Sequence, residues 1–299
     1  MAEILLSLTI IGVVAAITLP SLTGNINERT WNTQRKALYA RFSQAIALMP
    51  ALNGYGSTAE NAAETFVTSG LSKVLKINNI CDKDHVFDCG FASSITTYSA
   101  NQIALPRKLS DLNGGIVDGT AGLIIKNTNA AAFETANGES ILAFYNPSCA
   151  SEGVEIVGAN DAGHPGYYMK QHVCANFLFD LNGSKGPNTV GKDIGFITVV
   201  SPTDSNVVMP LLARKLDHQF AQTDSGRQCA NLDADNRLPN IYELLSLYYN
   251  RMLVDWSGGT YWSATVVDSQ NAWSFGFGYG MKHAYPKDTS LDVQCVKRN

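Results

Sequence analysis

Glu3 is an acidic residue at the start of an otherwise uncharged apolar run, Ile4 to Leu19, which ends before Pro20. An ionised carboxylate in a lipid-buried helix costs about 2.5 to 3.5 kcal/mol on insertion scales, and such acids are usually functional. We expect Glu3 to pair with a cation, for which the terminal ammonium of a neighbouring copy is a candidate. The simpler alternative is a headgroup-level residue of a plain membrane anchor.

Six cysteines favour disulfides, because their number is even and none belongs to a CxxC metal-binding pair. An N-terminal anchor would place the rest of the chain outside the cytosol, where disulfides persist. Six cysteines allow fifteen connectivities, among which the sequence cannot choose. Local order favours Cys81 with Cys89, Cys149 with Cys174, and Cys229 with Cys295. The last pair would close a loop of 66 residues, worth about 4 kcal/mol in the chain-entropy model.

Oxygen-bearing side chains recur between residues 180 and 193 and could bind calcium, a hard cation that collects carboxylate and carbonyl oxygens. The candidate ligands are Asp180, Asn182, Ser184 and Asp193. An EF-hand needs glycine at its sixth position and glutamate at its twelfth, where this loop has Lys185 and Gly191. The alternative is a turn-rich hairpin without metal. Calcium is the one cofactor that the sequence brings into question.

The sequence lacks the common catalytic motifs. Its five histidines show no HExxH spacing, and it has no GxSxG, no P-loop and no GxGxxG before a helix. The formal net charge is −4, and the scattered basic residues form no stripe for nucleic acid. We therefore predict that the protein is not an enzyme and does not bind nucleic acid.

Two helical segments must position these residues. Residues 4–19 form a hydrophobic segment of sixteen residues, somewhat short of the roughly 20 that a bilayer core requires. Residues 21–49 are amphipathic, because their apolar side chains recur at spacings of three and four. The apolar stripe comprises Trp31, Leu38, Phe42, Ala45 and Met49, while Asn32, Arg35, Lys36, Arg41 and Gln44 fall largely elsewhere. The helix can bend near Pro20, and Pro50 ends it.

The stretch MAEILLSLTIIGVVAAITLPSL resembles the mature N-terminus of type IV pilins and pseudopilins. In that family a glutamate precedes an apolar helix with an IIG step and a proline, here Glu3, Gly12 and Pro20. The resemblance implies a helix that is held in the inner membrane before it packs into the core of a filament. The family also has a short basic leader and Phe-Thr-Leu or a similar stretch before the Ala-Glu pair. Here Met1 stands directly before the Ala-Glu pair. We therefore expect either that the native precursor carries a leader and up to two further mature residues, or that the start of the sequence has been recoded for expression.

Residues 53–205 have the pattern of a small antiparallel head. Short apolar runs alternate with clusters of Gly, Asn, Pro and Asp, which is typical of strands joined by loops. These runs are Gly122–Ile125, Ile141–Tyr145, Ala175–Leu181 and Ile194–Val200. We expect the sheet to pack on the amphipathic helix.

Residues 206–299 resemble the Lcl C-terminal type of C-type-lectin-like domain. Four motifs follow in the order of that family: RLPNIYEL, YWS, AWSFGF and the closing QCV. Cys229 and Cys295 lie where the family joins its ends, whereas Gln294 replaces the usual basic residue before the last cysteine. The sugar motifs EPN and WND are absent. A carbohydrate ligand therefore rests on analogy of fold alone.

The residue pattern of this last part supports a compact fold by itself. Residues 241–248 place their apolar side chains on one side, and Glu243 falls in the first turn, where the helix dipole favours an acid. Alternation at 262–267 and 273–278 predicts half-buried strands with most of their tryptophans in the core. Trp256 is the exception, because beside Asp255 and a Ser-Gly-Gly loop it could stack on a sugar or a partner.

These observations predict an α+β protein with a long N-terminal helix (1–52), an antiparallel-sheet head (53–205) and a lectin-like α+β domain (206–299). We expect a structural subunit of an extracellular type IV pilus-like filament. It would be a homopolymer that the pilus assembly machinery draws from the inner membrane, with a surface-exposed head for a host or cell-surface ligand. The alternatives are a minor tip pilin acting as an adhesin, a type II secretion pseudopilin, and a membrane-tethered binding protein that never polymerises.

Overall fold

The computed structural model describes twelve ranges of the chain. These are 29–48, 62–82, 85–104, 130–145, 155–161, 164–170, 173–200, 205–208, 212–215, 218–254, 258–278 and 281–297. The predicted hydrophobic segment 4–19, with Glu3, Gly12 and Pro20 around and within it, lies outside these ranges. Cys149 and Trp256 lie outside them as well. Within the described ranges, no helix has the length and apolar character that a bilayer crossing needs.

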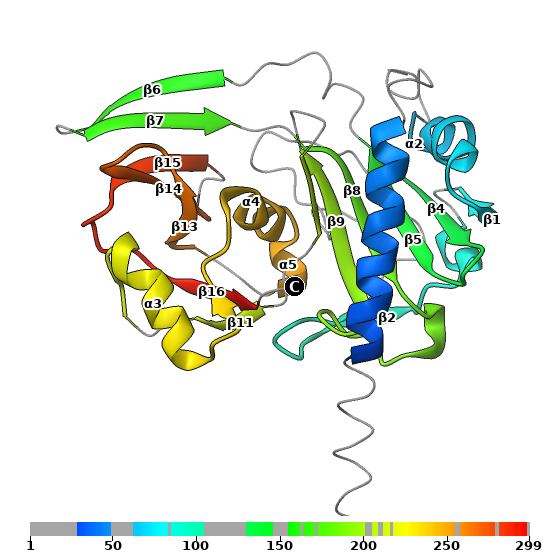
Figure 1. The fold of residues 1–299 in the computed structure, drawn as a ribbon. Helices are drawn as coiled ribbons and strands as arrows, with labels where there is room; N and C mark the ends of the chain where they lie inside the picture. The colour runs from blue at the N-terminus through cyan, green and yellow to red at the C-terminus, as the bar shows by residue number, and fades with distance from the viewer. Residues whose placement is uncertain are drawn as a thin grey trace, which may run out of the picture.

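A six-stranded antiparallel sheet lies at the centre of the described molecule (Figure 1). In spatial order its strands are β1 (Ile77–Cys81), β4 (Ala130–Thr135), β5 (Ser140–Tyr145), β8 (Val173–Asp180), β9 (Ile194–Val200) and β10 (Ser205–Val208). Three of the apolar runs predicted as strands fall in β5, β8 and β9, so these predictions are confirmed. The run 122–125 lies outside the described residues.

The helix of residues 29–48 covers one face of this sheet and is drawn in blue in Figure 1. Its predicted stripe packs there as far as it is described, since Leu38, Phe42 and Ala45 are buried and Trp31 is partly buried against the same core. Met49, the last residue of the predicted stripe, lies outside the described residues. The Phe42 ring meets the Phe177 ring edge-on at a centroid distance of 5.0 Å. The same core takes in α2 (Ala62–Thr65) and the short helical turns Phe66–Gly70 and Leu71–Lys73.

The opposite face of the sheet packs on the C-terminal part of the chain. In β5, Ile141 and Ala143 point into the core under the helix, while Leu142 and Phe144 join a second core with α4 (Ile241–Tyr249). Every residue of β5 is buried. The central sheet is therefore the middle layer of three, with helix 29–48 on one side and α4 on the other.

A five-stranded antiparallel sheet forms most of the C-terminal part. Its order is β13 (Thr260–Val266), β14 (Asn271–Gly276), β15 (Met281–Pro286), β7 (His164–Lys170) and β6 (Glu155–Asp161). The β6–β7 hairpin belongs in sequence to the predicted head, yet β7 pairs with β15 through Met169 and Lys282. The hairpin therefore crosses the boundary predicted at residues 205 and 206.

Smaller elements complete the fold. A three-stranded sheet has the order β11 (Leu212–Lys215), β16 (Gln294–Lys297) and β12 (Asn236–Arg237), and β2 (Ser94–Thr96) pairs with β3 (Gln102–Ala104). The remaining helices are α3 (Gln222–Leu232) and α5 (Arg251–Val254), with short helical turns at Val86–Cys89 and Gly183–Lys185. The predicted α+β class, with several antiparallel sheets and a few helices, is confirmed.

One predicted strand departs from simple alternation. Tyr261, Trp262 and Ser263 are all buried, whereas Ala264 and Val266 are exposed. The first half of β13 lies between two cores, because Tyr261 belongs to the core of α4 and Trp262 to a separate core around Cys229 and Cys295. The pairing of β13 with β14 then shifts register between Trp262 and Val266. The strand predicted over 262–267 is therefore confirmed as far as Val266, but its predicted alternation of buried and exposed residues is wrong. The alternation predicted over 273–278 is wrong as well, because residues 274–277 are all buried.

Candidate assembly surface and buried polar sites

The helix of residues 29–48 has an exposed face opposite the sheet. Its exposed side chains include Thr33, Ala37, Ala40, Gln44 and Ala47. Their spacing of three and four places them on one side of the helix. Ala37, Ala40 and Ala47 leave room for another helix to approach this face, which also carries the exposed cation Lys36. We treat it as the candidate assembly surface.

Arg35 anchors the helix to the central sheet. The side chain is only 4% exposed, and its Nη2 donates to the carbonyl oxygens of Gly191 at 2.9 Å and Lys192 at 2.8 Å. Burial lowers the pKa of Arg35 to about 10, while the charge of Asp193 works in the opposite direction. The prediction that Arg35 lies away from the buried face of the helix is therefore wrong. Position 35 follows Trp31 by four residues and precedes Leu38 by three, which is the helical spacing of the buried face.

The predicted calcium ligands lie in the loop that joins β8 to β9. Asp180 and Asp193 are fully buried, Asn182 is partly buried, and Ser184 is exposed on the turn Gly183–Lys185. The backbone N–H of Asn182 donates to Asp180 Oδ1 at 3.1 Å. The backbone N–H groups of Asn188 and Thr189 each donate to the Asp193 carboxylate at 2.8 Å. The two carboxylates therefore organise the turns of a β-hairpin, as in the alternative without metal.

Calcium binding at this loop stays a prediction. Across the described ranges, no cluster of three or more His, Cys, Asp or Glu side chains could hold a metal ion. Burial raises the pKa of Asp180 to about 7, against the opposing effect of the Asn182 N–H and with a smaller contribution from the charge of Asp193. Near neutral pH this carboxyl group is thus poised between its protonated and ionised forms.

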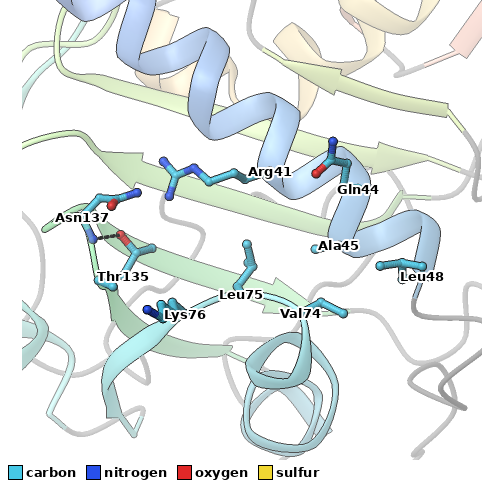
Figure 2. A pocket seen from close by; sticks show the side chains of 10 residues that line it. Arg41, Gln44, Ala45, Leu48, Val74, Leu75, Lys76, Thr135 and Asn137 are labelled. Carbon is cyan, nitrogen blue, oxygen red and sulfur yellow. Dashed lines mark hydrogen bonds between the residues drawn. The ribbon is translucent and has the colours of Figure 1, made fainter.

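A pocket of about 270 Å³ lies between helix 29–48 and the segment that enters β1 (Figure 2). Its lining residues are Arg41, Gln44, Ala45, Leu48, Val74, Leu75, Lys76, Thr135, Ala136 and Asn137. The Arg41 guanidinium forms an ion pair with the buried carboxylate of Glu139, which also accepts a hydrogen bond from the Thr135 hydroxyl. Arg41 and Glu139 thereby neutralise each other. Lys76 contributes an exposed cation at the rim of the pocket.

Two of the three predicted disulfides are confirmed. Cys81 bonds to Cys89, and Cys229 bonds to Cys295. The bridge predicted between Cys149 and Cys174 cannot be placed, because Cys149 and the Cys174 side chain lie outside the described structure. The Cys229–Cys295 bond joins α3 to β16 beneath Trp262, in a core that also includes Leu238 and Val293.

The RLPNIYEL motif builds the start of α4. The Asn240 side chain accepts a hydrogen bond from the Glu243 N–H at 2.8 Å, and the Glu243 carboxylate accepts one from the Asn240 N–H at 2.8 Å. This reciprocal capping satisfies two N–H groups that the helix leaves free. Arg237 holds both oxygens of the Glu243 carboxylate at 2.8 Å. The motif therefore has a structural explanation that needs no ligand.

The tryptophans of β13 and β14 differ in environment. Trp262 is fully buried, and its Nε1 donates to the carbonyl oxygens of Phe220 at 2.9 Å and Thr289 at 3.2 Å. Trp273 is partly buried, and the Lys282 ammonium lies 4.9 Å from its ring centroid. Burial lowers the pKa of Lys282 to about 8. Contact with the ring compensates part of the cost of burying this cation.

A buried hydrogen-bond network links the central sheet to α4. Asn176 and Asn250 exchange amide hydrogen bonds of 2.9 and 3.2 Å. Thr198 Oγ1 lies 2.8 Å from Asn176 Oδ1 and 2.7 Å from Ser246 Oγ. A hydroxyl has one proton, so Thr198 donates to Asn176 and accepts from Ser246. All four side chains are fully buried, and the sequence alone offered no pattern that would pair them.

No protein-family model matches this chain, and no curated protein sequence does either.

Proposed function

We propose that this chain is a subunit of a type IV pilus-like filament. The observation that carries the proposal is a pair of adjoining features of the N-terminal region. An acid-led apolar segment ends at Pro20, and the amphipathic helix that follows packs one face on an antiparallel sheet and exposes the other. The first segment would lie in the filament core, with Glu3 neutralised by a neighbouring copy. The head would face outward from the bacterial surface.

An adhesive role for the head rests on the analogy of its C-terminal part with a lectin-like fold. Its RLPNIYEL cap, its buried Trp262 and its Cys229–Cys295 bond fit a lectin-like domain whose ends are joined by a disulfide. A filament subunit with such a module could bind a host or cell-surface ligand. The size of this head favours, as the second candidate, a minor pilin at the filament tip. A type II secretion pseudopilin is the third.

Replacing Glu3 with Ala is expected to abolish surface fibres. Without the carboxylate, an incoming subunit has no partner for the ammonium of its neighbour, so assembly should stop while membrane insertion continues. Electron microscopy of sheared surface fibres and immunoblotting of the membrane fraction would measure the two steps. Glu64→Ala serves as the matched control, because Glu64 is an exposed acid in the first turn of α2.

The outcome separates a filament subunit from a tether. Normal fibres from the Glu3→Ala chain, or fibres whose density contains another protein, would contradict the proposal. Loss of fibres in the Glu64→Ala chain would mean that the assay reports general damage, and the Glu3→Ala result would then give the proposal no support.

A further inference from the structure

An exposed acidic loop with an apolar tip follows α3. Leu232 ends the helix and is 43% exposed, which is high for a large apolar side chain. Asp233 and Asp235 come directly after it and are also exposed. The carboxylate of Asp224 forms an ion pair with Arg227, which lies one helical turn further along α3. The uncompensated negative charge of this region therefore lies on Asp233 and Asp235.

The pocket beside helix 29–48 is complementary to this loop, because it has an apolar lining and a positive charge. Ala45, Val74 and Leu75 line it with apolar surface, and Leu48 stands at its edge with 53% of its surface exposed. Figure 2 shows these side chains between the helix and the strand segment below it. Since Arg41 is neutralised by Glu139, Lys76 supplies the net charge, which is positive. An apolar side chain flanked by acidic residues would therefore fit this pocket, because the apolar group would contact the lining and an acid would pair with Lys76.

The loop and the pocket lie on opposite sides of the molecule. In Figure 1, α3 is at one side of the C-terminal part, while helix 29–48, α2 and β4 are at the other, with both large cores between them. The loop of one chain therefore cannot reach its own pocket. A contact between two different surfaces repeats from copy to copy, and it gives an open filament when the rotation between copies does not close a ring.

We propose that residues 232–235 of one copy dock into the pocket beside helix 29–48 of the next copy. Leu232 packs against Leu48 and Leu75, and Asp235 lies beside Lys76. This contact rests on the proposed filament function and specifies how neighbouring heads meet. It lies away from the contacts among the N-terminal segments and adds to them.

Disulfide trapping between two full-length chains tests this contact. One chain carries Leu48→Cys and the other Leu232→Cys, each with its own affinity tag, and both are expressed in the same cells. After mild oxidation, we expect a mixed-tag dimer on a non-reducing gel. Separate chains exclude a bond within one molecule. Val266→Cys replaces Leu232→Cys in the matched control and should give no dimer. Val266 is an apolar residue of the same part of the chain and is somewhat more exposed than Leu232, at 51% against 43%.

Charge reversal provides the second arm. Lys76→Glu in the Leu48→Cys chain should lower the mixed-tag dimer about threefold, the size expected when an exposed ion pair becomes repulsive. Asp235→Lys in the partner chain should restore it. Fibres without the mixed-tag dimer would overturn the contact and leave the filament proposal intact. A mixed-tag dimer without fibres would support the contact and overturn the filament, and absence of both would overturn both.

Discussion

Arg35, Asp180 and Asp193 bring three ionisable groups into the buried junction between helix 29–48 and the β8–β9 loop. Arg35 uses its Nη2 on two carbonyl oxygens, and Asp193 uses its carboxylate on two N–H groups. Backbone dipoles thus replace water around the Asp193 carboxylate and around Nη2 of Arg35, whereas Nε and Nη1 of Arg35 are buried without a hydrogen-bond partner among the described residues. Asp180 has less compensation, and burial raises its pKa to about 7.

Asp180→Asn is expected to flatten the pH dependence of stability between about pH 4 and pH 7. The pKa of Asp180 rises from 3.8 to about 7 on folding, so the folded chain retains a proton that the unfolded chain releases. This contribution is fully present below pH 3.8 and is lost as the pH rises through 7. Urea unfolding of the full chain in detergent at several pH values would measure it.

The control for this prediction is Asp288→Asn, because Asp288 is exposed in the turn after β15. We expect the control chain to lose stability between pH 4 and pH 7 just as the parent chain does. An Asp180→Asn chain whose midpoint follows the same pH slope as the parent would contradict the assigned role.

At the scale of elements, the two described disulfides stabilise very different spans of chain. Cys229–Cys295 closes a span of 66 residues between α3 and β16, and Cys81–Cys89 closes one of 8 residues between β1 and the following helical turn. A longer closed loop removes more conformational entropy from the unfolded chain. The long bridge should therefore matter more to the free energy of unfolding.

Removing each bridge by a double Cys→Ala substitution tests this difference. We expect a loss of about 4 kcal/mol for Cys229 and Cys295 and about 2.5 kcal/mol for Cys81 and Cys89 in the chain-entropy model. Denaturant titration of the full chain in detergent would give both values. Equal losses, or a greater loss from the short bridge, would show that local packing outweighs loop closure.

At the scale of the whole molecule, the head and the C-terminal part share one core. Side chains of β5, β8 and β9 and side chains of α4 and β14 belong to the same buried cluster, with the Asn176–Asn250 network at its edge. Strands β6 and β7 add a second connection through β15. We expect the described parts to unfold together in a single transition, because neither part can expose this interface without losing its core.

Asn176→Ala and Asn250→Ala should each destabilise the chain by about 1–3 kcal/mol, because each leaves the other amide buried without its partner. The double variant should lose less than the sum by about 0.5–3 kcal/mol, since the two residues interact directly. Calorimetry of the four chains in detergent would measure the coupling. Gln44→Ala, at an exposed position, should change little. Strict additivity would show that the network does not link the two parts.

The sequence by itself predicted elements that have a local pattern, either apolar residues at helical spacing or a short apolar run between turn residues. The stripe of helix 29–48 and the start of α4 followed from helical spacing, the strands β5, β8 and β9 from apolar runs between turn residues, and two disulfides from cysteine order. The helix and the strands depend on residues close together in the chain, whereas the two disulfides were favoured only by the order of the cysteines among fifteen possible connectivities. The filament function, which rests on the N-terminal segment, and calcium binding at the β8–β9 loop both stay predictions.

Only the tertiary structure decided which distant residues meet. It placed Arg35 against Gly191, Arg41 against Glu139, and Asn176 against Asn250, and it moved the β6–β7 hairpin onto the sheet of the C-terminal part. These pairs are separated by many residues, and polar side chains show no periodicity that distinguishes a buried partner from a solvated surface. Local patterns report which face of an element is buried, whereas the identity of the facing residue depends on how the whole chain packs.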